Sequence, residues 1–145
     1  MSAHSEARVR ASFSKQGLMQ TLGATLTKVV PGHVEIALIP SPSVAQQHGF
    51  VHAGAVSAIA DSAAGYAALS MMAPDHGVLT TEFKINLVAP AIGDRIIARG
   101  RVVKAGRTLT LAQTEVFAET GGREKLIALL TATLMSVAGR DDVRD

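Results

Sequence analysis

The segment from Ala53 to Pro74 constrains the fold of this chain more than any other. It reads AGAVSAIADSAAGYAALSMMAP, so its side chains are almost all small or apolar and few are β-branched. Such a composition favours a helix, which we expect from about Gly54 to Met72, ended by Pro74 and Asp75. A helix of alanine and glycine is thin enough for a sheet to approach it closely. The chain is therefore expected to enclose this helix within other elements.

Runs with a period of two surround the helix. Two of them precede it, GATLTKVV from Gly23 and HVEIALIP from His33, with Pro31 and Gly32 forming the turn between them. Four more follow it, separated by turn-forming residues, at Val78–Val88, Arg95–Lys104, Thr108–Ala118 and Lys125–Val137. The tight turns favour antiparallel pairing between successive late strands. The order ββαββββ predicts an α+β fold in which a curved antiparallel sheet wraps around one long helix.

The length of 145 residues fits a single domain over residues 1–145. A short packing or lid helix is expected at about residues 5–16, because Val9 and Phe13 lie four residues apart on one face. Residues 139–145 are expected to form a flexible tail. The apolar run LIALL at 126–130 would expose one apolar face of a single sheet, which indicates an oligomer.

Composition excludes several classes of protein. The net charge is only +2 and aromatic residues make up 3%, so a nucleic-acid surface is not supported. Without cysteine there is no thiol nucleophile, disulfide or cysteine zinc site, which fits a reducing compartment, and we expect a cytoplasmic protein. The first twenty residues lack the apolar core of a signal peptide. No basic anchors flank the 53–74 segment, which argues against a membrane span.

Asp61 is the only charged residue between Ala53 and Pro74. A carboxylate in such an apolar segment loses hydration, which hydrogen bonds, a cation or an open site must replace. Ser57 and Gly65, four residues to either side, leave room for a ligand on its face. On the pattern alone, two interpretations stay open: a reactive carboxylate, or a structural one satisfied by backbone amides.

The residues around Asp61 resemble the PaaI-type branch of the hotdog-fold acyl-CoA thioesterases. In that family an Asn or Gln in a loop precedes His-Gly-Gly, which opens the helix, and an Asp or Glu follows on the helix. Here Gln46 lies six residues before His52, and Asp61 follows nine residues after it. The resemblance covers roughly residues 18–137, including the strand TTEFKINLVAP at 80–90. One departure is Ala53, which stands where the family has its first glycine.

The resemblance implies hydrolysis of acyl-CoA to a free acid and coenzyme A, with no metal or redox cofactor. The backbone amides of Ala53 and Gly54 would stabilise the oxyanion, because a helix N-terminus offers free N–H groups and a positive dipole end. Asp61 would act as general base or as nucleophile. Gln46 would donate its amide or orient the reactants. His52 is open to two interpretations, acid–base chemistry or a helix-start residue that binds the loop.

Further residues have weaker assignments. Thr80 aligns with a Ser or Thr that holds the water or the Asp in some relatives, and Thr81 is the alternative one residue on. Lys104 and Arg107 flank a turn where cations would meet the coenzyme A phosphates; three arginines are further candidates, Arg95, Arg99 and Arg101. Five apolar residues could shape an acyl pocket, although each also suits the core: Phe13, Leu18, Met19, Met71 and Met72.

A metal site is not expected, because His48 and His52 have no evident third ligand. Two other functions stay open, a non-catalytic acyl-CoA binding domain and a hotdog enoyl-CoA hydratase or dehydratase, although the hydratase motif is absent. In the resembled family the helix amides and the carboxylate of one site come from different subunits. We therefore expect a dimer as the minimal active unit and a dimer of dimers as the assembly.

Overall fold

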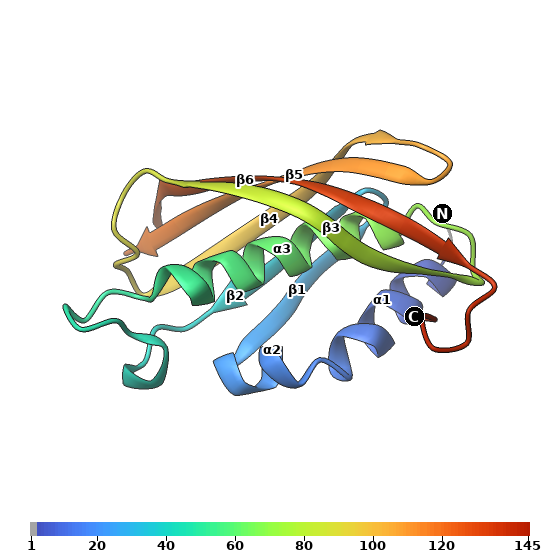
Figure 1. Ribbon diagram of the computed structural model, residues 1–145. Helices are drawn as coiled ribbons and strands as arrows, with labels where there is room; N and C mark the ends of the chain where they lie inside the picture. The colour runs from blue at the N-terminus through green and yellow to red at the C-terminus, as the bar shows by residue number, and fades with distance from the viewer. Residues whose placement is uncertain (1–2) are drawn as a thin grey trace.

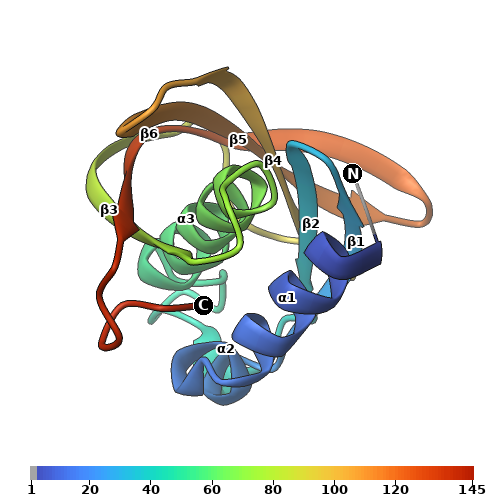
Figure 2. The same ribbon diagram turned by 90° about the vertical axis from the view of Figure 1, so that its right-hand side faces the viewer.

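The computed structural model describes residues 3–145 as one six-stranded antiparallel sheet wrapped around a central helix (Figure 1). The elements run in the order α1 (Ala3–Ser14), α2 (Gly17–Leu22), β1 (Ala24–Val30), β2 (His33–Leu38), η1 (Pro42–Val44), α3 (Ala53–Leu69), β3 (His76–Leu87), β4 (Arg95–Ala105), β5 (Leu109–Thr120) and β6 (Arg123–Ala138). The predicted α+β class and strand–helix order are confirmed. Figure 2 shows the sheet curving around α3, with α1 and α2 on the side that it leaves open.

The sheet touches the backbone of α3. Ala60, Ala63 and Ala64 are completely buried against it. A methyl group on Gly100 of β4 would overlap the backbone carbonyl of Ala63, and the hydroxyl of Thr114 on β5 donates to the carbonyl of Ala60 at 2.8 Å. The small residues of α3 are thus what allows the close approach, as the sequence predicts.

The strand order is β1-β2-β4-β5-β6-β3. Tight turns join β4 to β5 and β5 to β6 in antiparallel pairs, as predicted. The expected pairing of β3 with β4 is wrong, because β3 pairs with β6 instead. The connection over residues 88–94 is too long for a tight hairpin. It crosses the first part of β6, where the amide of Val88 donates to the carbonyl of Ile127 at 2.8 Å. As a consequence, β3 forms one edge of the sheet.

The N-terminal region differs from the expectation in its details. Helix α1 starts and ends two residues before the predicted 5–16, and a second short helix, α2, was not predicted. Val9 is completely buried, and the rings of Phe13 and Tyr66 meet edge to face at 6.1 Å between centroids. Met19 brings α2 into the same core. Both helices therefore pack on the body of the protein. None of the helices in residues 3–145 has the length and apolar character needed to span a membrane.

The C-terminal residues, expected to be a flexible tail, fold back between α1 and β3. The Asp145 carboxylate accepts hydrogen bonds from the Ser12 hydroxyl at 2.7 Å and from the Val78 amide at 3.0 Å. Gly77 makes room for the tail, because a methyl group there would overlap the carbonyl of Val143. Sequence patterns gave no indication of these long-range contacts, since they join residues more than sixty positions apart.

The run at 126–130 is less exposed than the sequence suggests. Ile127, Ala128 and Leu130 are buried against the core, next to a bulge between Val116 and Phe117 of β5. Leu126 is 40% exposed, and Leu129 is half-buried. Only part of this run is therefore available to a second subunit.

Candidate active site

His52 begins helix α3 as its N-cap. Its backbone is extended, and its Nδ1 atom accepts a hydrogen bond from the Gly54 amide at 2.7 Å. The Gly54 amide is thus engaged within the chain. The amide of Ala53 has no partner among residues 3–145, so it is the freer of the two predicted oxyanion donors. The geometry agrees with the interpretation of His52 as a helix-start residue.

Gln46 holds the loop that leads into the helix. Its Oε1 atom accepts from the amide of His48 at 2.5 Å and from that of Phe50 at 3.3 Å. These two bonds fix the orientation of the side-chain amide, because only the oxygen can accept from a backbone N–H. The Nε2 group has no partner in the described part of the chain and can donate to a ligand.

A cavity of about 500 Å³ lies at this end of α3. Gln46, His52 and Ala53 contribute its polar wall, and the last residue of β3 with the connection that follows it contributes an apolar wall. The residues of that apolar wall are Leu87, Val88, Ala89, Pro90 and Ala91. The cavity can take an apolar or amphipathic ligand with its reactive carbonyl near the helix start.

Asp61 lines a different cavity, of about 260 Å³. The Thr80 hydroxyl donates to its Oδ1 atom at 2.8 Å, whereas the Thr81 hydroxyl donates to the carbonyl of Thr133. Partial burial raises the pKa of the Asp61 carboxyl above its usual range, and the Thr80 hydrogen bond opposes that rise. The structure thus brings Thr80, and not Thr81, to the carboxylate.

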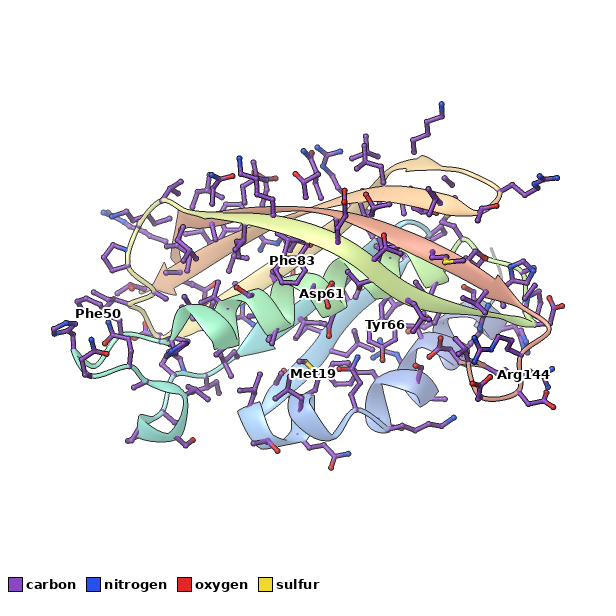
Figure 3. The ribbon with its side chains drawn as sticks, in the orientation of Figure 1. Met19, Phe50, Asp61, Tyr66, Phe83 and Arg144 are labelled. Atoms are coloured by element: carbon purple, nitrogen blue, oxygen red, sulfur yellow. The ribbon has the colours of Figure 1, made fainter. Side chains whose placement is uncertain are left out.

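Asp61 is not held as a structural carboxylate would be. Among residues 3–145 its only hydrogen-bond partner is Thr80, and no backbone amide reaches it. Figure 3 shows Asp61 in the middle of α3, while Phe50 marks the loop at the helix start. At a rise of about 1.5 Å per residue, the eight positions from Ala53 to Asp61 span about 12 Å. One carbonyl carbon cannot contact both groups of the same chain.

The cationic candidates fall into two groups. Lys104 and Arg107 are exposed at the tip of the β4–β5 hairpin, which lies at the opposite end of the molecule from the loop before α3 (Figure 1). Neither lines the cavities of Asp61 and Gln46 in its own chain. The three arginines of β4 are engaged on the outer face: Arg95 pairs with Glu119, Arg99 pairs with Glu35 and Glu124, and Arg101 bonds to Gln113.

Within residues 3–145 no three or more His, Asp or Glu side chains gather as a metal site would require. The apolar candidates line neither the Asp61 cavity nor the Gln46 cavity: Phe13, Leu18, Met19, Met71 and Met72.

Sequence reasoning missed most of the residues that line the Asp61 cavity, including Gln16, Tyr66 and Asp145. One indication was present, because Tyr66 is the only tyrosine of the chain and follows Asp61 by five residues in an alanine-rich helix.

Comparison with known proteins identifies the family of this chain. The sequence profile of the thioesterase superfamily matches residues 48–125. A thioesterase family protein from Silicibacter pomeroyi is 48% identical, with a TM-score of 0.91 over 93% of this chain and 99% of that one. A point mutant of the phenylacetic acid degradation protein PaaI from Thermus thermophilus is 26% identical, with a TM-score of 0.72 over 83% of this chain and 98% of that one.

Among curated proteins, 1,4-dihydroxy-2-naphthoyl-CoA hydrolase from Listeria monocytogenes is 25% identical over 118 residues, which are 81% of this chain and 94% of the relative. These similarities confirm the resemblance to PaaI-type hotdog proteins. The profile covers more than half of the chain and includes the helix that bears Asp61. The chain therefore belongs to the thioesterase superfamily and is an enzyme that hydrolyses thioesters.

Proposed function

We propose that the protein hydrolyses acyl-CoA thioesters at a site made by two copies of the chain. The observation that carries this proposal is the separation of about 12 Å along α3 between the free Ala53 amide and Asp61. A tetrahedral intermediate needs an oxyanion donor within about 3 Å and a base or nucleophile at a similar distance. The two groups can serve one thioester only if they come from different chains.

The edge strand β3 supports a way of bringing them together. It pairs with β6 on one side only, and the side chains of Leu79, Phe83 and Leu87 along it are about half exposed. A second copy can extend the sheet by antiparallel pairing with this edge. With a two-fold axis near Lys84, Thr80 of one chain lies opposite Val88 of the other. The Asp61 cavity of one copy then adjoins the Gln46 cavity of its partner.

The same two-fold reversal places the β4–β5 hairpin of one copy at the end of the dimer where the other copy has the start of α3. Lys104 and Arg107 on that hairpin are exposed and make no ion pair within residues 3–145, so they suit the phosphates of coenzyme A. The curated relative acts on a coenzyme A thioester, which favours the same carrier here. We also propose that two such dimers associate through Leu126 and Leu129 to form a dimer of dimers.

Two chemical routes fit Asp61. As a general base, it takes a proton from water while the water oxygen bonds to the carbonyl carbon; the thiolate then leaves and is protonated. As a nucleophile, one of its oxygens bonds to the carbonyl carbon and expels the thiolate, and water then hydrolyses the mixed anhydride. In both routes the Ala53 amide and Gln46 Nε2 donate to the oxyanion. Neither route uses a metal or a redox cofactor, and we place the reaction in the cytoplasm.

The test is a panel of benzoyl-, phenylacetyl- and straight-chain acyl-CoAs with thiol release as the readout, and crotonyl-CoA hydration measured in parallel. Thiol release without hydration is expected. Hydration without thiol release would favour the hydratase alternative, and tight binding with neither would favour the non-catalytic domain.

A single turnover in ¹⁸O-labelled water separates the two chemical routes. The base route puts the label only into the acid product. The nucleophile route, with water attacking the Asp61 carbon of the anhydride, puts it into Asp61, where mass spectrometry of the peptide detects it.

A further inference from the structure

Polar residues from three distant parts of the chain form a wall of the Asp61 cavity. Gln16 comes from the junction of α1 and α2, where it is the N-cap of α2; Tyr66 comes from α3 and Asp145 from the C-terminal residues. Figure 3 shows Asp61 and Tyr66 on the same helix, with Arg144 marking the tail. Lys15 and Arg144 also line the cavity, and the Arg144 guanidinium pairs with Asp141 at 3.4 Å. The neutral residues of this wall can select a ligand by its hydrogen-bonding groups.

A chain of hydrogen bonds fixes the direction of every group in this wall. The Ser12 hydroxyl donates its single proton to the Asp145 carboxylate at 2.7 Å, so it accepts from the Tyr66 hydroxyl at 3.2 Å. The Tyr66 oxygen in turn accepts from Gln16 Nε2 at 2.9 Å. The Gln16 Oε1 atom accepts from the Ser62 hydroxyl at 3.3 Å. Through Ser12 and Tyr66, the Asp145 carboxylate thus determines that Gln16 Nε2 is a donor and Gln16 Oε1 an acceptor.

The network is firmly held on its inner side. Ser12 and Tyr66 are 6% and 4% exposed, and the second carboxylate oxygen of Asp145 accepts from the amide of Val78. Burial raises the pKa of the Tyr66 hydroxyl, which keeps it protonated and able to donate. The side-chain amide of Gln16 is therefore held in one orientation at the cavity, with Nε2 toward Tyr66 and Oε1 toward Ser62.

Gln16 and Ser62 still have unused hydrogen-bonding capacity at the cavity surface. The second hydrogen of Gln16 Nε2 and the lone pairs of the Ser62 hydroxyl have no partner among residues 3–145. An oxygen on the ligand would accept from Gln16, and a ligand hydroxyl would also donate to Ser62. An apolar acyl group would displace water from the Gln16 N–H and leave this donor without a hydrogen bond.

We propose that Gln16, held by Tyr66, Ser12 and Asp145, is a specificity-determining residue that selects acyl groups with a hydroxyl or carbonyl oxygen at the end distant from the thioester. This inference rests on the proposed function and adds to it that the acyl group extends past Asp61 into the cavity that Asp61 lines. Asp145 acts as a positioning residue, because it reaches Gln16 only through Ser12 and Tyr66.

The test compares substrates in which an oxygen replaces a methyl group of nearly the same size: 4-oxopentanoyl- with 4-methylpentanoyl-CoA, and 5-oxohexanoyl- with 5-methylhexanoyl-CoA. In the unaltered enzyme, kcat/KM is expected to be about tenfold higher for the oxygen-bearing member of at least one pair. Gln16→Leu should abolish or invert this ratio, chiefly through the KM of the oxygen-bearing substrate. Gln20→Leu is the matched control, since Gln20 bonds to the carbonyl of Ser14 and lies outside the cavity, and it should keep the ratio.

Two further variants test the positioning role. Asp145→Ala should lower the ratio. Asp145→Asn keeps a side-chain oxygen that accepts from Ser12 but turns its NH2 group toward the Val78 amide, so it should restore the ratio only in part. Tyr66→Phe removes the acceptor for Gln16 and serves if Gln16→Leu does not fold. A ratio near one in the unaltered enzyme, or a ratio that Gln16→Leu and Tyr66→Phe leave unchanged, overturns the inference. Absence of thiol release from every acyl-CoA would instead contradict the proposed function.

Discussion

Both faces of helix α3 consist largely of small residues, but one face packs against the sheet and the other borders a cavity. On the face against the sheet, Ala63 and Ala64 are completely buried, and Gly100 of β4 touches the helix backbone. On the other face, Asp61, Ser62 and Gly65 remain partly exposed beside a cavity. Smallness on the first face permits close packing, and on the second it leaves space for a ligand. Equivalent substitutions on the two faces should therefore change different properties.

The largest effect is expected on the ligand face, from Asp61→Asn. This change keeps the shape of the side chain but removes its charge, so turnover of acyl-CoA should fall at least about a hundredfold. Because burial raises the Asp61 pKa, the ionised form destabilises the fold as pH rises through that pKa. The midpoint of thermal unfolding at neutral pH should thus stay level or increase. A variant with near-normal turnover would remove Asp61 from the mechanism.

On the sheet face, Gly100→Ala should mainly affect stability. The added methyl group overlaps the Ala63 carbonyl, and backbone on both sides leaves little freedom to yield. We expect a loss of about 2–3 kcal/mol in the free energy of unfolding by urea titration. Unchanged stability would mean that β4 and α3 do not approach each other this closely.

Gly65→Ala is the matched substitution on the ligand face. Its methyl group would meet the nearest atom, Cδ2 of Leu134, at an ordinary 3.7 Å, so the unfolding free energy should change by less than about 1 kcal/mol. The methyl group reduces the space beside Asp61, and KM should rise severalfold for bulky acyl groups and less for acetyl-CoA. Equal effects on all acyl groups would indicate that Gly65 does not border the acyl group.

The smallest effect is expected from Thr80→Val, which removes the hydrogen bond to Asp61 at nearly constant volume. That bond favours the ionised carboxylate, so its loss should raise the Asp61 pKa further. In the proposed mechanism the ionised form is the active one, so kcat/KM should fall as pH decreases through this pKa. The acidic limb of the pH profile should move to higher pH in Thr80→Val. A Thr81→Val variant should leave the limb in place, because Thr81 bonds to Thr133 instead.

Local patterns predicted most of the fold and part of the site. Period-two runs and the alanine-rich segment gave the strands and α3 to within a few residues, because they report burial on one face. The pairing of β3 with β6 was missed, since turn residues such as Pro90 mark a chain reversal but not which strand the chain returns to. Gln16 and Asp145 were missed for a related reason. Their role arises from hydrogen bonds between distant segments, which no spacing in the sequence encodes.

The central claim, that Asp61 and Gln46 of different chains serve one thioester, is tested most directly by mixing inactive subunits. Asp61→Asn and Gln46→Ala chains, combined in equal amounts under conditions of proven exchange, should form heterodimers with one intact site each. Random pairing predicts about a quarter of the normal activity. As a control, normal chains mixed with the double variant should retain about a quarter of the activity for a shared site and about half for a site within one chain. No recovery in the first mixture, or half the activity in the second, would contradict the shared site.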